Sequence, residues 1–225
     1  MPRIGTHLVS FFVVTALVAV GTLSVRAPAN FTQDIVENSG RPAALQVDMG
    51  RAEGLATLFA DVAVDEEFVE RHGTEWRNTL DLALDSANEV LKKVGVRVEM
   101  VSLSTWESND DQTHMSRILD GVLATTQRGS GRLLLAVTCQ DSVRFDGMAR
   151  DSAAAVVARY IHDDWQRNGS LIAHEIAHLL GAEHHPTDEE CESDGCLMEP
   201  AGYAHAAEWC DDHIEAIGAF LAAAV

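Results

Sequence analysis

The sequence predicts one α/β domain built around a largely parallel sheet. Apolar runs typical of strands alternate with amphipathic stretches typical of helices, in the order strand, helix, strand, helix, strand. Strands that alternate with helices in this way usually pair in parallel, because each helix carries the chain back across the sheet. The chain has 225 residues, enough to bury one sizeable core. We therefore expect a single α/β layer.

The first elements are a strand, a helix and a second strand. Leu55–Val64 is apolar and free of turn residues, which predicts a strand that ends at Asp65. A helix is predicted from Thr74 to Gly95, where glycine ends it. Its apolar face consists of residues three and four apart, namely Trp76, Leu80, Leu84, Ala87, Leu91 and Val94. Val96–Leu103 begins with alternating apolar and charged residues and predicts a half-buried strand.

The second half repeats the pattern. His114–Thr126 predicts a helix, and the continuous apolar run Arg132–Thr138 predicts a central strand covered on both faces. Ala154–Arg159 predicts another short strand, and a short strand near the next helix could pair with an extended peptide. The segment 163–169 then leads into the helix that carries the main motif.

That motif, H-E-x-x-H-x-x-G-x-x-H, occupies residues 174–184. On a helix His174 and His178 project from one face one turn apart, so both imidazoles can bind the same zinc ion. Gly181 lies where a helix commonly ends with a left-handed residue, and the turn lets His184 return as third ligand. An alternative third ligand is a downstream glutamate, Glu208 or Glu215.

The residue types of the motif point to catalysis. Three protein ligands leave a fourth position on zinc for water, which distinguishes a catalytic zinc site from a structural one. Glu175 follows the first ligand and is offset around the helix, so it can reach that water without occupying the metal. The alternative is a zinc-binding protein that recognises partners without cleaving them.

The net charge and the N-terminal segment indicate the partners and the location of the domain. The formal net charge is −19, with 16 basic against 35 acidic residues, which argues against a nucleic-acid partner and fits a haloadapted surface. Arg3 precedes an uncharged apolar run, Leu8–Val25, and Ala27-Pro28-Ala29 offers a cleavage site. Residues 1–29 are therefore a signal peptide or a retained membrane anchor, 30–52 a linker, and 53–225 the catalytic domain. Either form of the N-terminus places the domain outside the cytoplasm.

Four cysteines agree with export, because an even count in an exported chain favours disulfides. Three pairings are possible. We expect Cys191–Cys196, which would pin the loop after the third histidine, and this leaves Cys139–Cys210. The alternative is a second metal site, although the sequence contains no C-x-x-C.

These residues resemble the metzincin clan of zinc peptidases, and most closely its reprolysin (adamalysin) type. The segment Cys196-Leu197-Met198-Glu199-Pro200 resembles the family's C-I-M-x-P, in which a methionine, here Met198, lies beneath the three imidazoles. Trp209-Cys210 and a helix ending at Phe220-Leu221 resemble the family's C-terminal segment. The resemblance spans about residues 55–221. It implies a zincin-like fold with a twisted, mixed but mostly parallel sheet, long helices, and a small C-terminal subdomain with a Met-turn.

The resemblance also implies a zinc-dependent endopeptidase. We expect it to be a monomer, either secreted or held at the surface by its N-terminal segment. Its partners would be peptide or protein substrates, contacted by Gly147, Met148, Ala149 and Pro200. One catalytic Zn²⁺ is implied; Ca²⁺ is compatible with the family, but no residue pattern supports a site for it. The reprolysin type usually has Asp directly after the third histidine, whereas this chain has His185, which could serve as a spare ligand.

Overall fold

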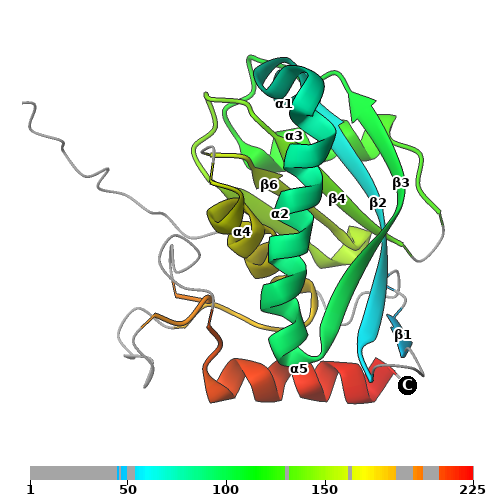
Figure 1. The fold of residues 1–225 in the computed structure, drawn as a ribbon, viewed down its shortest axis with the longest axis vertical. Coiled ribbons are helices and arrows are strands. Elements are labelled where there is room, and N and C mark those ends of the chain that lie inside the picture. Colours follow the sequence, from blue (N-terminus) through cyan, green and yellow to red (C-terminus); the bar gives the residue numbers. More distant parts are fainter. Residues whose placement is uncertain are drawn as a thin grey trace, which may run out of the picture. The chain divides into compact units, whose positions relative to one another are not determined.

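A computed structural model of the protein describes residues 45, 47–49, 54–129, 132–161, 164–185, 195–199 and 208–224. They form a six-stranded mixed sheet with helices on both faces (Figure 1), which confirms the predicted fold class. The strands are β1 Val47–Met49, β2 Ala56–Asp65, β3 Val96–Trp106, β4 Leu133–Thr138, β5 Gly147–Arg150 and β6 Ala155–Arg159. The α-helices are α1 Glu66–His72, α2 Trp76–Leu91, α3 Met115–Thr125, α4 Trp165–Leu179 and α5 Asp211–Ala224.

Strands β2, β3, β4 and β6 are parallel, as predicted, whereas β1 and β5 run antiparallel to their neighbours. Parallel ladders join β3 to β2, β2 to β4 and β4 to β6. β3 pairs along the whole length of β2, so β1 and β4 share the opposite edge of that strand. β5 pairs with β6 in the antiparallel direction and ends the sheet. The H-E-x-x-H motif therefore follows the last parallel strand, beside the β5 edge.

Each face of the sheet packs against its own helices. Leu58, Val62 and Leu135 belong to the apolar cluster that includes the buried faces of α2 and α4. Leu134 and Ala136 point the other way, into the cluster that contains the buried face of α3. All residues of β4 are buried, as the continuous apolar run predicted, because this strand has helices on both faces.

Helix α4 is held against α2 by a close backbone approach at Gly169. A Cβ built at Gly169 would lie 2.5 Å from the Ser86 Cβ and 2.8 Å from the carbonyl oxygen of Ala83. Only glycine fits this crossing without a shift of one helix. The crossing fixes the position of the motif helix relative to the core.

The structure differs from the predictions at short elements. The sequence did not predict α1, because the acidic residues from Asp65 onward indicate only the end of a strand. Asp65 also caps α1, accepting a hydrogen bond from the Phe68 N–H at 2.8 Å. β1 lies within the predicted 30–52 linker, and α4 begins at Trp165, earlier than the predicted lead-in allowed.

None of the described helices is long and apolar enough to cross a membrane. The predicted signal peptide or anchor, residues 1–29, lies outside the described residues.

Candidate metal centre

The metal centre is built on α4, which begins at a well-defined cap. The Asp164 carboxylate accepts hydrogen bonds from the backbone N–H groups of Gln166 and Arg167. From Asn168 onward every residue of the helix is buried. His174 and Glu175 are fully buried, and His178 is 3 % exposed. Packing on all sides therefore fixes the rotamers of the motif side chains.

The end of α4 forms a turn that shapes the site. Gly181 has a φ of 87°, and its N–H donates to the carbonyl of His178 while that of Ala182 donates to the carbonyl of Ala177. These two bonds are the Schellman pattern, which requires a left-handed residue at the glycine position. The turn brings the Ala182 carbonyl to 2.8 Å from Nδ1 of His178. Gly181 is therefore the left-handed residue at which α4 ends.

The segment around Met198 supports the first histidine. The Leu197 carbonyl lies 2.8 Å from Nδ1 of His174, and Met198 is fully buried. The Leu197 N–H donates to the carbonyl of Glu208, which ties this turn to the segment before α5. The turn is therefore in direct hydrogen-bond contact with the motif helix, where the Met-turn was predicted to lie.

The three motif imidazoles converge. Nε2 of His174 lies 3.2 Å from Nε2 of His178 and 2.9 Å from Nε2 of His184. A carbonyl oxygen can only accept, so the Nδ1 atoms of His174 and His178 carry the protons and their Nε2 atoms present lone pairs. Burial, and then the neighbouring imidazoles, holds the pKa of His178 well below its usual value. Imidazole nitrogens that converge in this way fit a divalent metal such as zinc.

The structure favours His184 over a glutamate as the third metal ligand of this group. The ligand atoms of the three histidines all lie within 4.8 Å of one another. Glu208 instead forms an ion pair with Lys93 at 2.8 Å, and Glu215 is exposed on α5.

Glu175 lies beside the centre, against the edge strand. A Cβ built at Gly147 would be 2.2 Å from Oε1 of Glu175, so the glycine backbone touches the carboxylate. Met148 and Ala149 are buried and contact opposite apolar clusters, so what β5 offers a substrate is backbone rather than these side chains. Pro200, the fourth predicted substrate contact, lies outside the described residues.

The predicted Cys139–Cys210 disulfide is wrong in this structure. The Cys139 thiol points to the carbonyl of Tyr160, and burial raises its pKa to about 12. Cys210 lies elsewhere, with its sulfur 2.9 Å from Nδ1 of His213. For the other predicted pair, Cys191 lies outside the described residues and Cys196 is a free thiol. The pairing failed because the sequence cannot show that Cys139 follows β4 beside Asp65, whereas Cys210 belongs to a different group of side chains.

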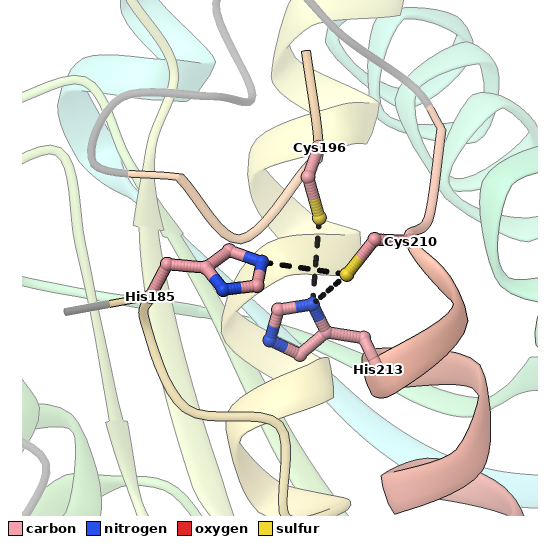
Figure 2. A group of neighbouring side chains, drawn as sticks. All are labelled: His185, Cys196, Cys210 and His213. Atoms are coloured by element: carbon pink, nitrogen blue, oxygen red, sulfur yellow. Dashed lines mark hydrogen bonds between the residues drawn. The ribbon is translucent and has the colours of Figure 1, made fainter. Parts of the chain in front are cut away.

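A second group of side chains was not predicted as a unit. His185, Cys196, Cys210 and His213 place their ligand atoms within 4.8 Å of one another (Figure 2). The sequence predicted His213 to be an ordinary surface or core histidine. A signal was present in the spacing Cys210-x-x-His213, which places both residues on one side of a helix start.

Comparison with known proteins agrees with this geometry. No curated protein matches the chain. The crystal structure of archaemetzincin from Methanopyrus kandleri, at 1.5 Å resolution, matches with a TM-score of 0.54 and 17% sequence identity, over 77% of this chain and 98% of that one. At that identity the likeness concerns the fold alone. Residues 57–213 match the family described as metallo-peptidase family M12. The predicted metzincin relationship is thereby confirmed, and the chain belongs to metallo-peptidase family M12.

Proposed function

We propose that this zinc peptidase is an endopeptidase that uses Glu175 as general base and acts outside the cytoplasm. The observation that carries the proposal is the position of Glu175. Glu175 is fully buried, directly follows His174 on α4, and touches Gly147 with its carboxylate at the start of the edge strand β5. A base, a metal centre and an edge able to hold a peptide are therefore adjacent.

The histidines would hold the metal in this account. His174 and His178 present Nε2 lone pairs because their Nδ1 atoms are engaged by the Leu197 and Ala182 carbonyls. His184 completes the group from beyond the Gly181 turn. Zinc bound there supplies a Lewis acid that lowers the pKa of water and polarises the scissile carbonyl.

Glu175 moves the proton. Its carboxylate accepts a proton from the attacking water and later delivers it to the departing amine. Glycine at position 147 leaves room for the carboxylate, since any side chain there would displace it.

Strand β5 would hold the substrate backbone. It pairs with β6 on one edge and has no second partner among the described strands. An extended peptide that adds to the outer edge as an antiparallel or parallel strand gains backbone hydrogen bonds without depending on its own termini. This mode of binding supports cleavage of internal peptide bonds, at the point where β5 meets Glu175.

Export is supported by the sequence of residues 1–29 alone, with its apolar run and its Ala-Pro-Ala segment. An exported enzyme that binds its substrate at an edge strand would act on peptides or unfolded protein segments. The strong negative charge favours substrates that are neutral or basic.

The test is incubation of the purified chain with a library of internally quenched peptides, with and without a zinc chelator, at low and high salt. The proposal predicts cleavage that stops with chelator and returns with added zinc, and mass spectrometry should place the cuts at internal bonds. Chelator-sensitive removal of terminal residues alone would overturn endopeptidase action. Zinc-dependent peptide binding without any cleavage would favour the rival function, a zinc-binding interaction protein.

A further inference from the structure

A second cluster of metal-ligating side chains lies next to the catalytic centre and takes no part in it. His185 directly follows the third catalytic histidine, Cys196 comes from the turn that contains Met198, and Cys210 and His213 come from the start of α5 (Figure 2). Three segments that are distant in sequence therefore meet at one point. Cys196 is fully buried, and Cys210 and His213 are 7 % and 6 % exposed.

The ligand atoms lie close to the spacing that a tetrahedral metal site requires. Nε2 of His185 lies 3.3 Å from the Cys210 sulfur, and Nδ1 of His213 lies 2.9 Å and 3.4 Å from the sulfurs of Cys210 and Cys196. Zinc bonds of about 2.3 Å to sulfur and 2.0–2.1 Å to nitrogen place tetrahedral ligand atoms roughly 3.4–3.8 Å apart. Small movements of the side chains would therefore accommodate the ion.

One histidine is already set in the tautomer that binds metal. Nε2 of His213 lies 2.7 Å from the carbonyl oxygen of Glu183, which can only accept a hydrogen bond. The proton is therefore on Nε2, and Nδ1 presents its lone pair to the two sulfurs. A backbone carbonyl that fixes the distal nitrogen in this way is a usual support for histidine ligands of zinc.

Charge balance also favours a metal at this place. Two thiols that lose their protons to bind Zn²⁺, together with two neutral imidazoles, give a site with no net charge, which can be buried at low desolvation cost. A disulfide between the two sulfurs would leave the convergence of two imidazoles on them unexplained. Four protein ligands fill the coordination sphere, which is typical of a structural rather than a catalytic zinc.

We propose that His185, Cys196, Cys210 and His213 form a structural zinc site that fastens the segments around the catalytic centre. His185 adjoins His184, and Cys196 adjoins Leu197, whose carbonyl holds His174. The Glu183 carbonyl that orients His213 lies one residue before His184. Zinc at this site would fix both the third catalytic ligand and the support of the first. The departure from the reprolysin pattern at position 185 then has a chemical reason, because histidine ligates where aspartate would not suit a thiolate-rich site. The inference does not depend on peptidase activity.

The test uses the full-length chain and Co²⁺ as a spectroscopic replacement for zinc. The purified protein should contain two zinc ions per chain. After metal removal, one of two equivalents of Co²⁺ should produce the near-ultraviolet absorption that marks cobalt bound to thiolate, since the catalytic centre has no sulfur ligand. A variant without the catalytic ligands, His174→Gln/His178→Gln, should bind one Co²⁺ and keep the full absorption.

Cysteine variants assign the signal. Cys210→Ser should abolish the absorption, whereas Cys139→Ser, which removes another buried thiol, should leave it unchanged. The proposal is overturned if wild-type protein shows no thiolate absorption with Co²⁺, or if thiol titration in denaturant shows Cys196 and Cys210 to be oxidised in the zinc-loaded chain. Loss of the signal in Cys139→Ser would equally overturn it. The wild-type spectrum decides the question even if Cys210→Ser does not fold.

Discussion

Substitution of Gly147 by alanine tests how the edge strand and the general base are arranged. The new Cβ would lie 2.2 Å from Oε1, 2.5 Å from Cδ and 2.7 Å from Cγ of Glu175. Ordinary contact begins near 3.4 Å, so the carboxylate must retreat by more than 1 Å or the strand must move. A displacement of about 1 Å at a catalytic group can reduce the rate on the order of 10²-fold. The three atoms nearest to this Cβ all belong to Glu175, so the histidines should keep their metal.

The assay is kcat/KM on a peptide identified from the library, together with zinc content. Gly147→Ala should lower kcat/KM on the order of 10²-fold with unchanged zinc. Gly121→Ala is the matched control, because a Cβ at Gly121 in α3 has no neighbour within 4 Å. Its activity should equal that of the wild type.

A double-mutant cycle with Glu175→Asp tests whether Gly147→Ala lowers activity by displacing the Glu175 carboxylate. The shorter aspartate leaves space for the alanine, so Gly147→Ala should cost little further activity in that background. If Gly147→Ala retains activity within threefold of wild type, or if it causes the same loss in both backgrounds, the proposed contact between Gly147 and the general base is refuted.

Three further predictions concern stability. Gly169→Ala should destabilise the fold by about 1–3 kcal/mol in urea unfolding, because its Cβ would overlap Ser86. Gly218→Ala in α5 is the control; its Cβ meets nothing within 4 Å, and the change should stabilise the fold by about 0.5–1 kcal/mol. Equal effects of the two substitutions would contradict the close crossing of α2 and α4. Burial raises the pKa of Glu67 to about 7 from an ordinary 4.5, so the folded state holds its proton more tightly and loses stability as the pH rises from about 4.5 to 7. Glu67→Gln should therefore raise the melting temperature at pH 8 but not at pH 4, and a pH-independent difference would refute the shift. With a net charge of −19, the wild type should melt at a higher temperature in molar salt than in dilute buffer, and an unchanged melting temperature would speak against haloadaptation.

The elements that sequence predicted well are those with long periodic patterns. The helix from Trp76 and the strand Leu133–Thr138 each have enough apolar residues to identify their period and burial. The motif histidines were found for the same reason, since a helix converts fixed spacing into a fixed geometry. The Gly181 turn followed from backbone sterics.

The features that the sequence did not predict depend on contacts between residues that are far apart in the chain. β5 has four residues and acquires its strand conformation by pairing with β6, which no local pattern indicates. The contact between Gly147 and Glu175 joins residues far apart in the chain. The Cys139–Cys210 pairing was wrong because cysteine count carries no information on distance, and the same limitation concealed the convergence of His185 and His213 on Cys210.

The most direct test of the central claim is peptide hydrolysis by Glu175→Gln with zinc measured in the same sample. Glutamine preserves the size and polarity of the side chain but cannot accept the proton of water, so cleavage should fall by at least on the order of 10²-fold while zinc content stays at the wild-type value. Undiminished cleavage by the zinc-loaded variant would contradict the assignment of Glu175 as general base.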